Sequence, residues 1–285
     1  MRSLLFVPGD SPRKFAKARA SMADVLILDL EDSVAATAKS DAREIVRTML
    51  EEGSSGPALW VRVNALDTGL TLEDLAAVMP LAPAGIVLPK AAGAADVERL
   101  ATWLDAFEVS GRLAQGTTGI IAVATETAEA VMGLGSYRGA SSRLRGLMWG
   151  AEDLAASLGA TTNAVDGVFT EPFRLARNLC LMAAASAGVA AIDTVSTKLR
   201  DLALVEEEAR AARRDGFAAK AVIHPGHLEI VNQAFRPTEA EADWARRVIA
   251  AFEEAPEAGV VTLDGKMVDK PHERAAQKIL AALGE

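Results

Sequence analysis

The segment DVLILDLEDSV, residues 24–34, joins a short apolar run to the acids Asp29, Glu31 and Asp32. An apolar run of this length without alternation is typical of a parallel strand that is covered on both faces. Seven further runs of this kind recur along the chain, and longer segments of helical periodicity separate them. Together with residues 24–28, the predicted strands are residues 3–7, 59–63, 85–88, 119–124, 146–149, 189–192 and 219–223.

This alternation of strands and helices predicts an α/β fold, a (β/α)8 TIM barrel. An open doubly wound sheet is the alternative, but it requires a glycine fingerprint such as GxGxxG after the first strand, and VPGD at residues 7–10 is not one. The expected helices are residues 12–20, 38–51, 70–78, 94–109, 175–187 and one that ends near residue 215.

The pattern changes after the predicted barrel. Thr238 and Glu241 have the T-x-x-E spacing of a capping box, which predicts a helix that begins there. A turn with an acid at each end, DGKMVD at residues 264–269, precedes a closing helix. We therefore expect residues 1–236 to form the barrel and residues 237–285 to form a helical extension that acts as a lid.

Composition narrows the class of protein. Half of the 285 residues are hydrophobic, which allows a large core, and the net charge is −9, which argues against nucleic acid and anionic membranes as partners. The single cysteine, Cys180, excludes an intramolecular disulfide and suits a reducing compartment. The N-terminus lacks the features of a signal peptide, and no apolar run reaches about 18 residues, so we expect a cytoplasmic protein.

Polar or ionisable residues follow almost every predicted strand. The active sites of TIM barrels lie at the carboxyl ends of the strands, so these side chains are expected to converge on one rim. Each residue taken alone is more readily explained as a loop charge or a helix cap, but packing does not explain so many ionisable residues at strand ends. The set is Asp29, Glu31, Asp32, Arg62, Asn64, Lys90, Glu126, Glu152, Asp153, Asp193 and His224.

Acids dominate this rim, and converging carboxylates repel one another unless a cation lies among them. A hard divalent ion with oxygen ligands, Mg²⁺ above all, is the expected cofactor, and the absence of His/Cys ligand spacing argues against zinc. Arg62 is suited to clamp a substrate carboxylate. Lys90 is expected to keep a high pKa and form an ion pair, with a Schiff-base role as the alternative. Arg13 and Lys14 are candidates for binding cofactor phosphates, with a solvated surface as an equal alternative.

The chain resembles the citrate lyase β-subunit-like proteins of the HpcH/HpaI aldolase superfamily, which also holds malyl-CoA and citramalyl-CoA lyases. The matching pieces are LFVPGDSPRKFAKA, ILDLEDSV, VRVN, GIVLPKA, TETAEAV, WGAEDLAASLG, AIDTV, GFAAKAVIHP and DGKMVDKP, in family order over nearly the whole chain. The resemblance implies a TIM barrel, a homotrimer or hexamer, and action on CoA or acyl-carrier thioesters.

The resemblance also implies roles for individual residues. Glu126 of TETAEA and Asp153 of GAEDL would be the metal ligands, with Glu126 also facing the substrate. Arg62 of VRVN would bind the carboxylate of a 2-oxo acid, and the backbone amides of Gly150 and Ala151 would hold the same group.

Three further acids would complete the catalytic set. Glu31 and Asp32 of LEDSV would orient metal-bound water and nearby basic residues. Asp269 of DGKMVD would act in proton transfer, and the lid of a neighbouring subunit would deliver it to the site. The chain departs from the family pattern at His227, where glutamine is common, and at residues 196–198, where an aromatic residue and an acid are expected. In the family, the region of residues 196–198 helps to form the carrier side of the site, so the thioester carrier and the exact acid stay open.

The implied reaction is a reversible Claisen-type cleavage of a 3-hydroxyacyl thioester, such as malyl-, citramalyl- or citryl-CoA, to acetyl-CoA and a 2-oxo acid. Three alternatives stay open: a metal-dependent aldolase of 2-oxo-3-deoxy sugar acids, a malyl-CoA thioesterase, and a non-catalytic subunit that binds thioesters. The lid motif favours a thioester substrate over a sugar acid. The full acidic rim argues against a non-catalytic protein.

Overall fold

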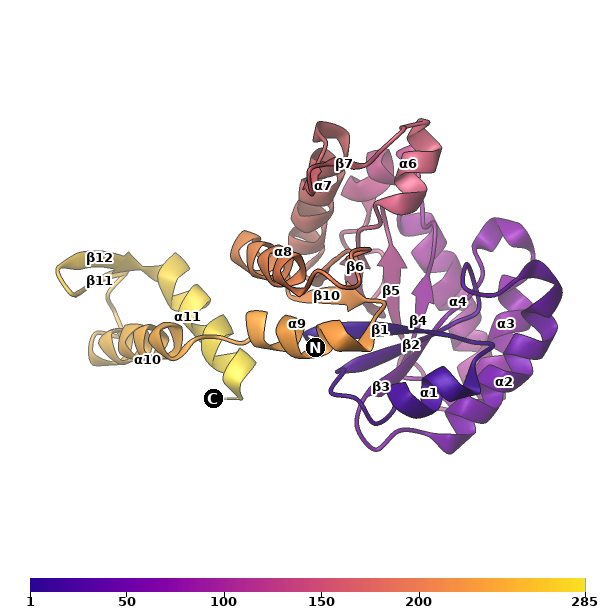
Figure 1. The fold of residues 1–285 in the computed structure, drawn as a ribbon. Coiled ribbons are helices and arrows are strands. Elements are labelled where there is room, and N and C mark those ends of the chain that lie inside the picture. Colours follow the sequence, from indigo (N-terminus) through magenta and orange to yellow (C-terminus); the bar gives the residue numbers. More distant parts are fainter. Residues whose placement is uncertain (285) are drawn as a thin grey trace. The chain divides into compact units, whose positions relative to one another are not determined.

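In the computed structural model, which describes residues 1–284, eight parallel strands close into a barrel (Figure 1). Their order around the barrel is β1-β10-β9-β6-β5-β4-β3-β2, so the predicted TIM barrel is confirmed. Each predicted strand overlaps one strand of the barrel. The strands are β1 (Ser3–Pro8), β2 (Val25–Asp29), β3 (Ala58–Arg62), β4 (Gly85–Leu88), β5 (Gly119–Val123), β6 (Leu144–Met148), β9 (Ala190–Asp193) and β10 (Ala219–Val222).

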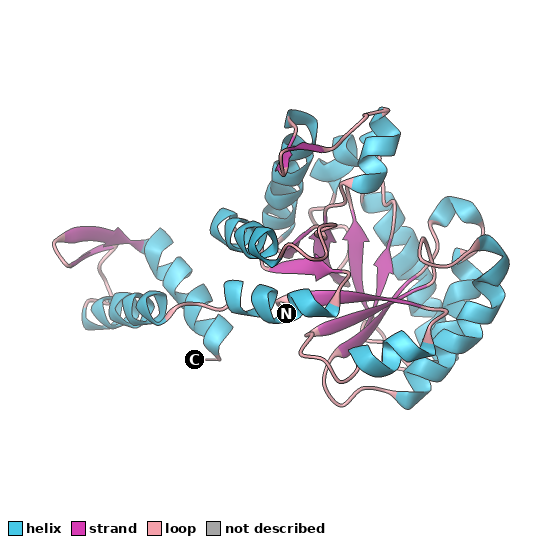
Figure 2. Cartoon of the chain, viewed as in Figure 1, coloured by secondary structure: helices cyan, strands magenta, loops and turns pink. Residues whose placement is uncertain are grey.

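Helices surround the barrel, as the strand-and-helix alternation predicts (Figure 2). They are α1 (Pro12–Ala18), α2 (Lys39–Glu52), α3 (Thr71–Val78), α4 (Ala94–Ser110), α5 (Ala128–Gly133), α6 (Glu152–Leu158), α7 (Glu171–Ala187), α8 (Leu202–Asp215) and α9 (Leu228–Ala234). A small hairpin of β7 (Ala164–Val165) and β8 (Val168–Phe169) connects α6 to α7. The sequence did not predict this hairpin, because strands of two residues carry no periodicity.

Apolar side chains fill the interior of the barrel. Leu4, Ile27, Val87, Ile121 and Ile192 are among the buried residues of this core, which also contains the ring of Trp60. The indole lies against two strand glycines: a Cβ at Gly85 would come within 2.2 Å of the ring, and one at Gly119 within 2.9 Å. Since both glycines open their strands, the aromatic plug fills the N-terminal half of the barrel and leaves the carboxyl ends of the strands for the site.

The chain divides into two compact units, Met1–Ala234 and Phe235–Glu285. The second unit contains α10 (Glu239–Glu254), β11 (Val260–Leu263), β12 (Lys266–Asp269) and α11 (Lys270–Leu283). The predicted capping box is present, because the Thr238 hydroxyl accepts from the Glu241 amide and the Glu241 carboxylate accepts from the Thr238 amide. The acid-flanked turn of residues 264–269 belongs to an antiparallel hairpin, which the sequence analysis did not foresee.

A small apolar core of its own holds the second unit together. Ala245, Val248 and Phe252 of α10 pack with Val268 of β12 and Ala276 of α11. The spacing of the three α10 residues places them on one face of the helix, as expected for an amphipathic helix. Among residues 1–284, no helix is long and apolar enough to cross a membrane.

Candidate active site

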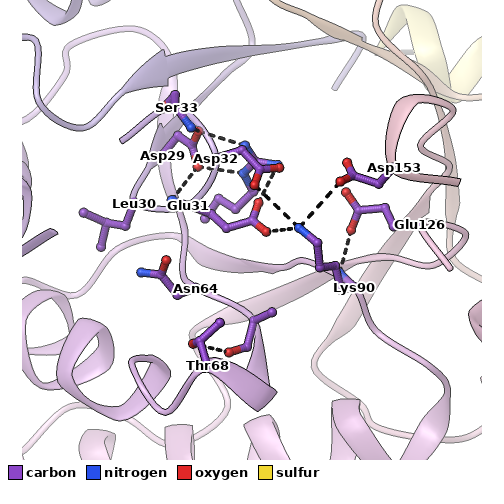
Figure 3. A network of polar contacts seen from close by, with 12 residues as sticks. Asp29, Leu30, Glu31, Asp32, Ser33, Asn64, Thr68, Lys90, Glu126 and Asp153 are labelled. Carbon is purple, nitrogen blue, oxygen red and sulfur yellow. Dashed lines mark hydrogen bonds and ion pairs between the residues drawn. The ribbon is translucent and has the colours of Figure 1, made fainter. Parts of the chain in front are cut away.

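The carboxyl ends of five strands bring seven charged side chains together (Figure 3). We call this group the rim cluster: Asp29, Glu31, Asp32, Arg62, Lys90, Glu126 and Asp153. The strands deliver these residues because parallel strands of a barrel all end at the same face. The convergence expected from the sequence is therefore present at these positions.

Arg62 and Asp29 form the firmest pair of the cluster. Arg62 Nε lies 2.7 Å from Asp29 Oδ1 and Nη2 lies 2.8 Å from Asp29 Oδ2, which is a bidentate ion pair. The two residues are register partners on β2 and β3, so the sheet itself sets them side by side. Nη1 contacts Glu31 Oε2 at 3.0 Å. Asp29 thus fixes the guanidinium and leaves its Nη1 side to face the other acids.

Lys90 contacts acids that follow three different strands of the barrel. Its backbone N–H donates to Glu126 Oε2 at 2.5 Å, and its ammonium contacts Glu31 and lies 3.8 Å from Asp153 Oδ1. The residue has a φ of +51°, a left-handed conformation that costs a side-chain-bearing residue about 1 kcal/mol or more. This strained turn points both the amide and the ammonium toward carboxylates (Figure 3).

The carboxylates around Lys90 keep its ammonium charged. Burial alone would lower the pKa of Lys90, but the hydrogen bond and charge of Glu31, aided by the Glu126 charge, raise it above its ordinary value. A lysine forms a Schiff base only as the neutral amine, so the raised pKa favours the ion pair over the Schiff-base alternative.

Glu126 is an acid of the cluster whose pKa is strongly raised. Its side chain is buried, and burial raises the pKa of its carboxyl to about 7. The Lys90 N–H opposes this shift, whereas the charges of Glu31 and Asp153 add to it. A glycine makes room for the buried carboxylate, because a Cβ at Gly150 would lie 3.1 Å from Glu126 Cγ.

The rim cluster has more negative than positive charge. Five carboxylates face two cations, Arg62 and Lys90, which leaves a formal charge of −3 when all seven groups are ionised. Glu126 and the half-exposed Asp153 are oxygen donors suited to a hard divalent ion. Among residues 1–284, no three His, Cys, Asp or Glu side chains gather as a metal-binding group. A site with two protein carboxylates fits Mg²⁺, which completes its shell with substrate and water.

A cavity of about 720 Å³ opens beside the rim cluster. Of the residues predicted for the site, Lys14, Asp32, Arg62, Glu126, Gly150, Ala151 and Asp153 line it. Arg13 is exposed and lies outside the lining, and the role predicted for the Arg13–Lys14 pair stays a prediction. Lys17, one helical turn after Lys14, lines the cavity in its place. The i, i+3 spacing of these two lysines was the signal that the sequence analysis missed.

Comparison with known proteins shows the family to which the chain belongs. The model of the HpcH/HpaI aldolase/citrate lyase family matches residues 2–225. This chain belongs to that family. A (3S)-malyl-CoA thioesterase of Cereibacter sphaeroides is 36% identical to it over 98% of this chain and 93% of the relative. A citrate lyase subunit beta-like protein of Mycobacterium tuberculosis is 38% identical over 99% and 95% of the two chains. A mitochondrial citramalyl-CoA lyase of Homo sapiens is 31% identical over 97% and 83%.

A solved structure of the same family has the same fold. The CitE protein of Mycobacterium tuberculosis, in complex with magnesium, acetoacetate and coenzyme A, superimposes with a TM-score of 0.78 at 36% identity. The match covers 100% of this chain and 98% of the CitE chain. The recognition of the family from its sequence motifs is therefore confirmed.

The two backbone amides expected to bind a carboxylate differ from each other. Gly150 N–H donates to Thr125 Oγ1 at 2.9 Å, so this amide is already engaged. The Ala151 N–H has no hydrogen-bond partner among residues 1–284. It is therefore the Ala151 amide, at the N-cap of α6, that stands available to a ligand in the cavity.

One residue of the predicted rim, Asp193, lies outside the rim cluster. Asp193 ends β9, but its side chain contacts Lys220 and Arg177, which lie behind the barrel wall. Its neighbour Ile192 points into the barrel core, so alternation along the strand turns Asp193 outward. His227 is buried and its ring contacts Leu199 O at 3.1 Å, so this departure from the family pattern is a packed loop residue.

Asp269 lies in the second unit, at the N-cap of α11. Its carboxylate and the ring of His272 form a capping pair, with Oδ1 2.5 Å from Nδ1. The hydrogen bond from His272 lowers the pKa of Asp269, which makes the carboxylate a weaker base in this arrangement. The role of Asp269 in proton transfer stays a prediction.

Proposed function

We propose that this chain is a Mg²⁺-dependent carbon–carbon lyase that reversibly cleaves a 3-hydroxyacyl thioester into an acetyl thioester and a 2-oxo acid. The observation that carries the proposal is Glu126, a buried carboxyl with a pKa of about 7 beside Asp153 in a cluster with surplus negative charge. The names of relatives support it, since they include a citrate lyase subunit beta-like protein and a citramalyl-CoA lyase. The CitE structure with magnesium, acetoacetate and coenzyme A supports the cofactor and the ligand class.

Glu126 and Asp153 are the residues proposed to hold the metal. When bound there, Mg²⁺ acts as a Lewis acid that offsets negative charge developing on the substrate oxygen. The protein environment suits that task, because the rim cluster already disfavours the ionised form of Glu126 and a divalent ion removes the repulsion.

Arg62 and Ala151 are proposed to hold the carboxylate of the 2-oxo acid product. Asp29 fixes the Nε and Nη2 edge of the guanidinium, so a ligand carboxylate would meet the Nη1 side, where Glu31 now lies. The unengaged Ala151 N–H, also on the cavity wall, is a second donor for the same group. Such preset donors orient the bond that breaks relative to the rim acids.

In the cleavage direction, a base takes the proton of the substrate hydroxyl. The electron pair of that O–H bond forms the carbonyl of the 2-oxo acid while the carbon–carbon bond breaks. The pair from the broken bond becomes the enolate of the acetyl thioester, which then takes a proton at carbon. In reverse, Asp269 from the lid of a neighbouring subunit would remove that α-proton, which requires a base freed from His272 and shielded from water.

The other end of the substrate is a thioester carrier, and Lys14 and Lys17 are the proposed contacts for its phosphates. Both lysines are exposed on α1 and line the cavity. Exposed ammonium groups attract phosphate with little desolvation cost. Either CoA or a phosphopantetheine-bearing carrier protein fits this chemistry. Malyl-, citramalyl- and citryl-CoA are the proposed substrates to test first.

A second candidate function is hydrolysis of the thioester. The observation that favours it is the relative named (3S)-malyl-CoA thioesterase, 36% identical over 98% of this chain. Such a reaction would use the same metal and cavity but would release free CoA and an intact hydroxy acid. The two outcomes differ in their products, so one assay separates them.

The test gives the purified protein each of the three CoA esters with Mg²⁺, with and without EDTA. Release of acetyl-CoA and a 2-oxo acid, abolished by EDTA, supports the lyase. Release of free CoA without a 2-oxo acid supports the thioesterase. No reaction with any ester contradicts both and favours an aldolase of sugar acids or a non-catalytic subunit.

A pair of matched variants ties the activity to the site. Glu126→Gln removes the buried acid, and Glu129→Gln makes the same change three residues later at an exposed position of α5. We expect Glu126→Gln to lower kcat by about 1000-fold or more, since a lost transition-state contact of this kind is worth several kcal/mol. Glu129→Gln should leave kcat unchanged. Equal activity in both variants would remove Glu126 from the mechanism.

A further inference from the structure

A buried set of charges lies behind the barrel wall, outside the rim cluster. Asp193 Oδ2 is 2.9 Å from Lys220 Nζ, and Asp193 Oδ1 is 3.2 Å from Arg177 Nε. The side chains of Asp193 and Lys220 are only 5% and 2% exposed. Burial alone would raise the pKa of Asp193, but the charges of Lys220 and Arg177 outweigh burial and hold it below its usual range. Asp193 is therefore a buried carboxylate anion.

Stability is a weak explanation for such a set. Removing two charges from water costs several kcal/mol, and well-packed apolar residues often replace a buried ion pair at no loss of stability. A buried ion pair does impose a fixed geometry on the groups that it contacts. The question is which group uses that geometry.

Trp149 connects this carboxylate to the active-site cavity. Its indole Nε1–H donates to Asp193 Oδ1 at 2.7 Å, while the residue lines the cavity. The indole is fully buried and packs edge-on against Phe169, with ring centroids 4.9 Å apart. A buried indole N–H needs an acceptor, and a carboxylate is a stronger one than a neutral carbonyl.

Trp149 also begins the segment that carries the site. Gly150 and Ala151 follow it directly and provide the free amide, and Asp153, four residues after Trp149, is a proposed metal ligand. Gly150 is tied on the opposite side, because its N–H donates to the hydroxyl of Thr125. The segment is thus held between two anchors, Thr125 on the rim side and Asp193 behind the wall.

We propose that Asp193 is a positioning residue, which orients residues 150–153 through the indole of Trp149. The inference rests on the proposed function for its meaning, because those residues are taken to bind the metal and the 2-oxo acid. Lys220, whose ammonium lies 2.9 Å from Asp193 Oδ2, holds the carboxylate in place. Asp193 itself touches neither substrate nor metal.

The test uses Trp149→Phe, which removes the indole N–H and keeps an aromatic ring against Phe169. Asp193→Asn is the complementary change. Arg177→Gln is the matched control, because it removes another donor to the same Asp193 oxygen without touching Trp149. Should Asp193→Asn fail to fold because Lys220 then keeps only Glu208 as a counter-ion, Trp149→Phe still decides the question.

Two measurements are made on each variant: the Kd for Mg²⁺ by calorimetry, and hydrogen exchange of the Gly150 and Ala155 amides. These amides donate to Thr125 Oγ1 and Ala151 O, so they report the order of the segment. We expect Trp149→Phe to raise the Kd about 10-fold, as loss of a supporting contact around a metal site does, and to speed exchange of both amides. Arg177→Gln should change neither quantity by more than about twofold.

The double variant Trp149→Phe/Asp193→Asn sharpens the test. If Asp193 acts only through its hydrogen bond with Trp149, the Kd and the exchange rates of the double variant should be no higher than those of the more affected single variant. The inference is overturned if Trp149→Phe leaves exchange and Kd unchanged, or if Arg177→Gln alters both equally. If the unmodified protein binds no Mg²⁺, the proposed function fails, and the exchange rates alone then decide the positioning role.

Discussion

Two buried glutamates at opposite ends of the barrel have opposite electrostatics. Glu126, at the carboxyl ends of the strands, has a pKa raised to about 7. Glu108 lies at the other end with Asp105, Thr118 and Arg143, a group that we call the N-terminal cluster. Burial alone would raise the pKa of Glu108 too, but hydrogen bonds from Arg143 and Thr118 lower it to about 2.

The difference lies in the number of donors that each carboxylate has. Glu108 accepts from both Nη atoms of Arg143, at 3.0 and 2.6 Å, and from the amides of Gly116 and Thr118, at 2.7 and 2.8 Å. Glu126 accepts from the Lys90 amide and faces other acids. A carboxylate whose partners are complete stabilises the fold, whereas one left among like charges is available to bind a cation.

The largest expected effect on stability comes from the N-terminal cluster. Glu108→Gln leaves the buried Arg143 without its main counter-ion, so we expect a loss of about 3–5 kcal/mol in the free energy of unfolding. Urea denaturation measures it. The Kd for Mg²⁺ should stay the same, and a weakened Kd would contradict the separation of the two clusters.

At the rim cluster we expect the opposite change in the free energy of unfolding when the glutamate is replaced. Glu126→Gln should stabilise the metal-free protein at pH 8 by up to about 3 kcal/mol, the equivalent of raising a carboxyl pKa from 4.5 to about 7. Because its pKa is raised, Glu126 destabilises the folded protein where the carboxyl is ionised. This destabilisation is absent below pH 4.5 and fully present above about pH 7, so the stabilising effect of Glu126→Gln should vanish at low pH. A destabilised variant at pH 8 would show that Glu126 is a satisfied structural acid.

The pH dependence of the two ends should differ as well. Because Glu126 takes up a proton near pH 7, Mg²⁺ affinity should fall up to tenfold for each unit below that pH. The depressed pKa of Glu108 contributes stability above pH 4.5 and loses it only as the pH falls through about 2. Calorimetry between pH 5 and 8 measures the first effect, and Mg²⁺ affinity that is constant over this range would contradict it.

The smallest effect is expected on α1. Lys17→Met should raise KM for a CoA ester roughly fivefold, since an exposed ion pair is worth about 1 kcal/mol at most. Arg13→Met is the control, because Arg13 lies outside the cavity lining, and its KM should stay unchanged. A larger effect at Arg13 than at Lys17 would favour the pair that the sequence predicts, Arg13 and Lys14.

The fold followed from the sequence because most barrel strands are short apolar runs bounded by helices, with a charged residue only inside β6 (Arg145) and β10 (Lys220) among those runs. The hairpin β7–β8 was missed because strands of two residues carry no pattern, and the hairpin β11–β12 because its strands are largely exposed and mix polar with apolar residues. Its position at a strand end places a residue near the rim but does not determine the direction in which its side chain points. The alternation of side chains along β9 turns Asp193 away from the barrel interior. The Asp29–Arg62 pair depends on strand register, which single-sequence patterns do not determine.

The central claim is that the surplus negative charge of the rim cluster takes up a divalent cation through Glu126. The most direct measurement is a calorimetric titration of Mg²⁺ at pH 8 into the unmodified protein, Glu126→Gln and Glu108→Gln. We expect one ion to bind per chain, more than about a 100-fold loss of affinity in Glu126→Gln, and no change in Glu108→Gln. Equal binding in the first two proteins, or none in the unmodified one, would contradict the claim.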